Sequence, residues 1–130
     1  MKATSVRRIA AVTAALVFGF LAIVAQANPS GKWRIKFNSS ADADGVIVFR
    51  IAPVGGEPID VETKIPGGTT ENKVASLVRD SLTAALGKGY KVSRDDFEDV
   101  VIKKTGKTPK FEVSLASSTL TGLDINVKRQ

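Results

Sequence analysis

Four acidic residues form the densest group of side chains that could carry out chemistry: Asp95, Asp96, Glu98 and Asp99. Such a group could act as a carboxylate pair in acid–base catalysis or hold a hard cation such as calcium. A calcium loop needs ligands at alternate positions followed by a spaced bidentate glutamate, and this group lacks that spacing. Aspartate is also common in exposed turns, where it hydrogen-bonds to the local backbone. An enzyme that depends on the Asp95–Asp99 carboxylates is therefore one alternative for the function.

The chain contains no histidine and no cysteine. This excludes Ser–His and Cys–His nucleophile pairs, and it excludes zinc sites built from histidine or cysteine ligands. Gly106-Lys107-Thr108 ends like a phosphate-binding loop, but Val101 stands where the first glycine should be and Pro109 prevents the helix that should follow. Asp42 and Asp44 precede an apolar strand and not the rest of a calcium loop. We expect no catalytic residue, no cofactor and no bound metal.

The segment from Lys103 to Lys110 carries several cations and no acid. Its turn residues Gly106 and Pro109 predict a hairpin. Such a hairpin could bind an anionic surface such as lipopolysaccharide, lipid or nucleic acid, although lysines on strands also serve to keep an edge soluble. The possible anion contacts are Lys103, Lys104, Lys107 and Lys110.

The first 27 residues have the three parts of a secretory signal peptide. Lys2, Arg7 and Arg8 precede an apolar run over residues 9–24, and Ala25-Gln26-Ala27 follows. As a helix the run spans about 24 Å, less than the ~30 Å of a bilayer core, so we expect cleavage after Ala27 and a periplasmic or secreted product. Without the leader, 16 basic and 13 acidic residues remain, a net charge of +3. Such a mild excess does not predict binding to nucleic acid.

Hydrophobic periodicity predicts one helix and about six to seven strands in residues 28–130. Between Thr69 and Gly89 an apolar stripe recurs at helical spacing: Val74, Leu77, Val78, Leu82 and Ala85. A threonine at 69 or 70 can cap this helix, and Gly87 can end it. Period-two alternation predicts strands near residues 33–37, 46–52, 59–65, 90–93, 100–102, 111–115 and 123–127, with Trp33 in the core and a hairpin loop over Ser39–Gly45. We expect a single α+β domain, a mainly antiparallel sheet with the helix packed on one face.

Four stretches carry a resemblance: Asp44–Arg50, Gly68–Ala75 continuing into Arg79-Asp80, Glu98–Lys104 and Thr121–Leu123. They resemble small exported proteins of Gram-negative bacteria that have no assigned activity. The helix with the strands that follow it is also similar to a recurring module of phage tail and surface proteins. The resemblance implies export and no catalysis, and it assigns no site residue.

Together these observations favour a non-catalytic exported domain that binds another macromolecule. Its partner would be a protein or an envelope component that docks on an exposed strand edge. We expect no nucleic-acid partner and only a transient contact with the membrane, through the signal peptide. The anionic-surface binder and the carboxylate enzyme remain the two alternatives, and the sequence pattern sets no oligomeric state.

The leader gives a direct prediction. The protein accumulated by the exporting cell should begin at Asn28, because the small residues Ala25 and Ala27 form the cleavage signal. Intact mass and N-terminal sequencing measure this, and a product that still begins at Met1 would contradict it.

Overall fold

The computed structural model describes residues 28–130, and the predicted signal peptide, residues 1–27, lies outside the described residues. The elements are β2 (Lys32–Asn38), β3 (Gly45–Pro53), β4 (Ile59–Ile65), α3 (Glu71–Leu86), the 3-10 helix η1 (Gly87–Gly89), β5 (Tyr90–Asp95), β6 (Asp99–Lys104), β7 (Phe111–Ser118) and β8 (Asp124–Arg129). The predicted helix and strands are all present, and the α+β class is confirmed. Within residues 28–130 no helix is long and apolar enough to span a bilayer.

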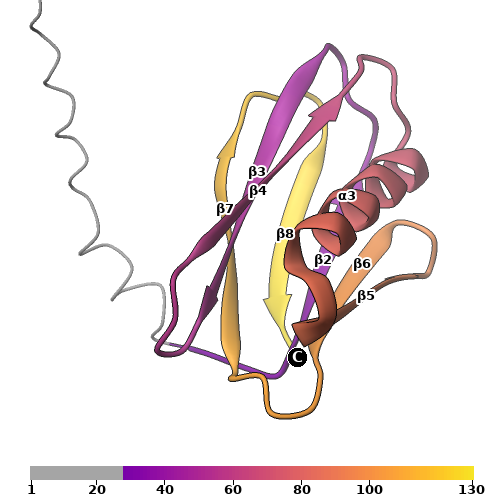
Figure 1. Ribbon diagram of the computed structural model, residues 1–130. Coiled ribbons are helices and arrows are strands. Elements are labelled where there is room, and N and C mark those ends of the chain that lie inside the picture. The colour runs from indigo at the N-terminus through magenta and orange to yellow at the C-terminus, as the bar shows by residue number, and fades with distance from the viewer. Residues whose placement is uncertain (1–27) are drawn as a thin grey trace, which may run out of the picture.

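The seven strands form two antiparallel sheets instead of one (Figure 1). One sheet has the order β5-β6-β2-β8 and the other has the order β4-β3-β7. Apolar side chains on the inner faces of the two sheets meet: the rings of Phe37 in β2 and Phe49 in β3 pack edge to face, with centroids 6.3 Å apart. One helix of this length could not cover both inner faces, so each sheet provides the cover for the other.

Helix α3 lies along the side where both sheets end. It contacts the edge strands β4 and β5, and also β2 and β6 behind them. Its buried residues are Val74, Ala75, Val78, Leu82 and Leu86. Gly87 ends the helix with a φ of 69°, a left-handed conformation that glycine adopts without strain. The helix therefore closes one side of the two-layered core.

Two local predictions were wrong. Ala85 was placed in the apolar stripe but is exposed, because the buried ridge follows four-residue steps from Val74 to Leu86. The hairpin loop predicted over Ser39–Gly45 joins β2 to β3, and these strands belong to different sheets.

The strand from Val46 to Ala52 is central in its sheet, with its outer side chains half-buried. Trp33 is 5% exposed, so its core position is confirmed.

Burial of the helix ridge gives a stability prediction. Leu82 is fully buried, so Leu82→Ala should lower the free energy of unfolding by about 2–5 kcal/mol through lost contacts and a cavity. Ala85→Ser is the control on the same helix; its side chain is exposed, so the change should stay below about 0.7 kcal/mol. Urea denaturation measures both, and equal losses would contradict the assigned faces.

Candidate anion-binding surface

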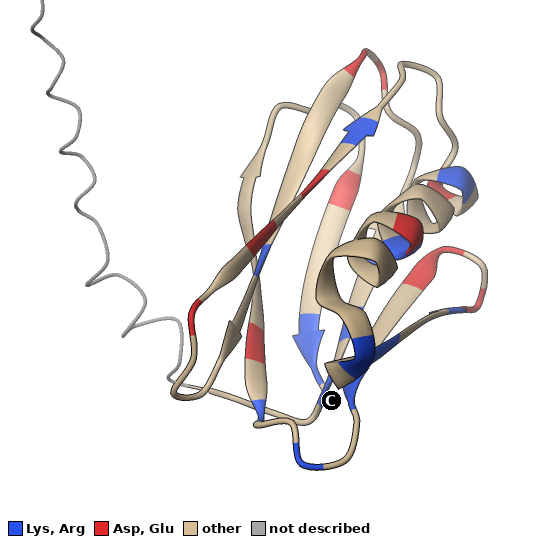
Figure 2. Ribbon diagram, in the orientation of Figure 1, with Lys and Arg blue, Asp and Glu red and all other residues tan. Residues whose placement is uncertain are grey.

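Lysine and arginine residues gather at one end of the two sheets (Figure 2). Neighbouring strands of the four-stranded sheet run in opposite directions, so β2 and β5 begin at this end while β6 and β8 finish there. Helix η1 joins them, since the Thr105 hydroxyl donates to the Lys88 carbonyl oxygen at 2.8 Å. We call this region the basic end, and its cations are Lys32, Lys88, Lys91, Lys103, Lys104, Lys107, Lys110, Lys128 and Arg129.

Three lysines stand side by side on the outer face of the four-stranded sheet. Lys103 of β6 lies directly opposite Lys91 of β5 and directly opposite Lys32 of β2. All three are exposed, and none forms an ion pair within residues 28–130. Strands lie about 4.8 Å apart, so this lysine row spans roughly 10 Å. Like charges directly opposite one another destabilise a sheet, and an anionic ligand would remove that cost.

A hollow of about 410 Å³ adjoins the lysine row. It is lined by Ser30, Gly31, Lys32, Lys103, Lys104 and Gln130. The aliphatic part of Lys104 lies against Gly31, and its Nζ donates to the Gly106 carbonyl oxygen at 3.1 Å. Ser30 is fixed by its backbone N–H, which donates to the Phe111 carbonyl oxygen at 2.8 Å, and by its hydroxyl, which donates to the Gln130 carbonyl oxygen at 2.9 Å. Hydrogen bonds thus hold the backbone of this basic hollow in place while lysines line it.

The hairpin predicted over Lys103–Lys110 was wrong. β6 pairs with β5 and β2, whereas β7 pairs with β3, so the segment between them crosses from one sheet to the other. The crossing is needed because the inward residues on either side of it, Ile102 and Phe111, belong to opposite layers of the core. A hairpin would have left both in one sheet.

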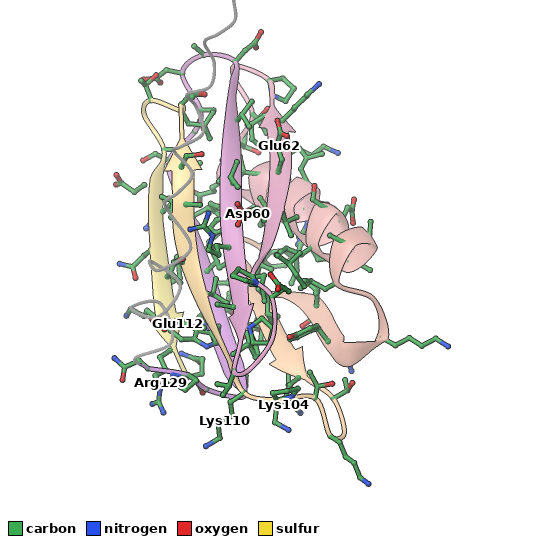
Figure 3. All side chains as sticks on the ribbon, turned by 60° about the vertical axis from the view of Figure 1, so that its left-hand side comes forward. Asp60, Glu62, Lys104, Lys110, Glu112 and Arg129 are labelled. Atoms are coloured by element: carbon green, nitrogen blue, oxygen red, sulfur yellow. The ribbon has the colours of Figure 1, made fainter. Side chains whose placement is uncertain are left out.

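The four predicted lysines therefore do not form one cluster. Lys103 joins the lysine row and Lys104 lines the basic hollow. Lys107 is exposed on the crossing segment, and Lys110 is exposed where that segment meets β7. Figure 3 shows Lys104, Lys110 and Arg129 at the same end of the molecule, away from Asp60 and Glu62. All four thus belong to the basic end, but only two flank the hollow.

Sequence reasoning missed Lys32 and Lys91, which complete the row. Both follow the alternation, since each neighbours an inward aromatic residue, Trp33 or Tyr90, at the start of a strand. Alternation predicts the face of each lysine but not which strands become neighbours. Without the order β5-β6-β2 nothing in the sequence brings these three positions together.

Two of the four acids of the predicted cluster, Asp95 and Asp99, pair with Arg34 of β2. Its Nη2 lies 2.7 Å from Asp95 Oδ2, and its Nη1 lies 2.7 Å from Asp99 Oδ2. The arginine thereby links three strands of the sheet, β2, β5 and β6. Its hydrogen bond and its charge lower the pKa of Asp95. A general acid at neutral pH needs a raised pKa, so Asp95 does not suit that role. The two short ion pairs instead give Asp95 and Asp99 a structural role.

Phe97, in the turn between β5 and β6, was not singled out by its sequence. It is 69% exposed and has a φ of 65°, a left-handed conformation that is unusual for a bulky residue. The preceding Asp96 is also left-handed, with a φ of 51°. The Arg94 guanidinium carbon lies 6.0 Å from the centre of the Phe97 ring, so a cation steadies the ring from one side.

Other positions in residues 28–130 offer less to a ligand. The buried Asp99 Oδ1 has no hydrogen-bond partner among the described residues, but the adjacent Arg34 disfavours a metal cation there. In this part of the chain no three acidic side chains are arranged to hold a metal. A second hollow, of about 420 Å³, lies between the start of β3 and the end of β4, and its Asp44 carboxylate already accepts the Gly67 N–H at 2.7 Å. The basic end is therefore the candidate site.

Arg34 gives a stability prediction with a matched control. Arg34→Gln should lower the free energy of unfolding by about 3 kcal/mol, because Asp99 is 2% exposed and would lose its cation. Arg50→Gln breaks an ion pair with Asp60 whose side chains are 36% and 48% exposed, so it should cost less than about 1 kcal/mol.

The ion pairs of Arg34 also predict that the stability lost in Arg34→Gln depends on pH. The pKa of Asp95 is lower in the folded protein than in the unfolded chain, so its pairing stabilises the fold at neutral pH. That contribution is lost as the pH falls through the range below about 4, where aspartate becomes protonated. The stability difference between wild type and Arg34→Gln should therefore shrink in acid. Denaturation at neutral and acid pH tests this, and a constant difference would contradict it.

Searches of the chain against models of protein families and against curated protein sequences find no match. The resemblance to small exported proteins of Gram-negative bacteria therefore stays an expectation from the sequence. No residue receives a role by comparison, and the case for a function rests on the geometry of the basic end.

Proposed function

We propose that the domain is a non-catalytic exported protein that binds an anionic macromolecule or surface through its basic end. The observation that carries this proposal is the lysine row: Lys91, Lys103 and Lys32 lie in register on three adjacent strands with no acid opposite them. Such an arrangement opposes folding, because like charges on neighbouring strands repel. A polyanion would turn this repulsion into attraction.

Fixed backbone around the basic hollow supports the same proposal. Ser30 and Gln130 hold the two sheets together where Lys32, Lys103 and Lys104 line the hollow. A bound anion would meet several ammonium groups without rearrangement of the main chain. Less conformational entropy is lost on binding when the site is already ordered.

The two other candidate functions have weaker support. Docking of a protein on a strand edge could use β7 or β8, the edge strands away from α3, but it gives the lysine row no role. An enzyme built on Asp95 and Asp99 would need a free carboxylate, whereas both bind Arg34 at 2.7 Å. Export remains part of the proposal through the basic flank, apolar run and small-residue end of residues 1–27.

Binding to heparin, a soluble polyanion, tests the proposal. The affinity should fall steeply with salt, and the variant carrying Lys32→Gln, Lys91→Gln and Lys103→Gln should bind at least tenfold more weakly, by at least about 1.4 kcal/mol. The control carries Lys36→Gln, Lys64→Gln and Lys73→Gln, an equal charge change outside the basic end, and should lose far less. Salt-independent binding, or equal losses in both variants, would contradict the proposal.

A stability measurement separates a binding role from a purely structural one. Lys103 has a cation on each side, so Lys103→Gln should raise the free energy of unfolding by about 0.2–1 kcal/mol while it weakens heparin binding. A variant that loses both stability and affinity would indicate that Lys103 serves the fold.

A further inference from the structure

We infer that the anionic partner is the surface of a lipid bilayer, and that the basic end of the domain contacts its phosphate head groups. This inference rests on the proposed function, because it names the partner of the same site. Its further observations are that the cations come from several segments at one end of the molecule, that an apolar side chain lies among them, and that the opposite end carries acids.

The cations of the basic end come from separate segments that finish at one end of the molecule. They lie at the start of β2, in η1 and the start of β5, at the end of β6 and on the segment that follows it, and at the end of β8. The turn between β3 and β4 reaches the same end, since Pro53 pairs with Phe111 at the start of β7. Figure 1 shows these segments together near the C-terminus. Several turns at one end suit a broad, flat partner better than a single strand held in a groove.

An exposed apolar side chain lies among these cations. Val54, in the turn between β3 and β4, is 44% exposed, and its backbone N–H donates to the Lys110 carbonyl oxygen at 2.9 Å. Soluble polyanions gain nothing from an apolar side chain. At a bilayer, valine can enter the interface while neighbouring lysines extend their aliphatic stems and keep their ammonium groups at the phosphates.

The opposite end of the molecule carries more acids than cations, although Lys64 at the end of β4 and Lys73 at the start of α3 also lie there. The turn between β5 and β6 carries Asp95, Asp96 and Glu98, and the loop before β3 carries Asp42 and Asp44. An anionic bilayer attracts one end of this charge distribution and repels the other, so it orients the domain. Two acids also lie near the basic end: Glu57 in the turn between β3 and β4, and Glu112, whose carboxylate accepts the Asn28 N–H at 3.5 Å. The nine cations of the basic end outnumber these two acids.

The basic end has little with which to read nucleic acid. Single strands are held by aromatic side chains that stack on the bases. Tyr90 is half-buried and packs edge to face on the buried Phe111 ring, with centroids 5.1 Å apart. Phe97 is exposed but sits at the acidic end. Phosphate recognition without base stacking favours lipid head groups.

Co-sedimentation with vesicles tests the inference, using protein purified in its processed form so that the leader cannot itself bind lipid. Vesicles of phosphatidylethanolamine with phosphatidylglycerol should bind the domain, whereas phosphatidylcholine vesicles should not. Each lysine at an anionic surface changes affinity by about fivefold, so Lys32→Gln with Lys91→Gln and Lys103→Gln should lose about a hundredfold. The control variant with Lys36→Gln, Lys64→Gln and Lys73→Gln should lose far less affinity for the vesicles.

Val54→Ser distinguishes a bilayer from a soluble polyanion. It should weaken vesicle binding by about threefold to tenfold and leave heparin binding unchanged, because only the bilayer offers an apolar interior. Phe97→Ser is the matched control, because Phe97 is an exposed apolar residue at the acidic end. This change should alter neither vesicle binding nor heparin binding. Equal loss of heparin and vesicle binding in Val54→Ser would overturn the membrane assignment.

The remaining outcomes separate the two levels of the proposal. Binding to heparin and to duplex DNA, with no binding to either kind of vesicle, would overturn the membrane inference and leave anion binding standing. Failure to bind heparin, DNA and both vesicles would overturn the inference together with the proposed function. Vesicle binding that survives loss of the lysine row but fails in the control variant would place the membrane contact elsewhere and overturn the inference.

Discussion

The pairing of β2 with β6 puts five apolar side chains on one face of the four-stranded sheet: Trp33, Ile35, Phe37, Val100 and Ile102. They are buried against the second sheet and helix α3. A slip of one residue would turn a whole strand's apolar side chains to solvent, so burial fixes the register. The same register necessarily sets Lys32 opposite Lys103. The lysine row therefore costs the fold some repulsion, but it needs no contact of its own to be held in place.

Charge changes along the outer face of this sheet as the strands run away from the lysine row. Two residues further along β2, Arg34 lies on the same face as the lysines and pairs with Asp99 of the adjacent strand β6 and with Asp95 of β5 beyond it. At the far end Asn38 lies opposite Asp124. Acids therefore neutralise the cation in the middle of this face, whereas the lysine row at one end has no acid beside it. This division makes the basic end stand out more than the net charge of +3 over residues 28–130 suggests.

Much of the fold could be predicted because alternation and a helix-ending glycine are local signals. The predicted threonine cap was wrong in one respect, since Thr70 stands at the N-cap position but makes no side-chain capping hydrogen bond. Trp33 and its alternate neighbours identified a strand, and Gly87 marked the end of the helix. Pairing is not local: the alternation that placed Lys32 on a polar face could not name Lys103 as its neighbour. For the same reason the segment from Lys103 to Lys110 was mistaken for a hairpin. Sequence reasoning thus found part of the candidate site, and the rest depended on the strand order.

Trp33 is the only tryptophan of the chain, and its Nε1–H donates to the Phe111 carbonyl oxygen at 2.8 Å across the junction of the two sheets. Its indole is surrounded by core residues of both layers. The fluorescence of this single tryptophan therefore reports the docking of one sheet on the other, whereas far-ultraviolet circular dichroism reports the strands themselves. A chain whose layers separate before its strands melt would show a red shift in emission ahead of any change in the dichroism.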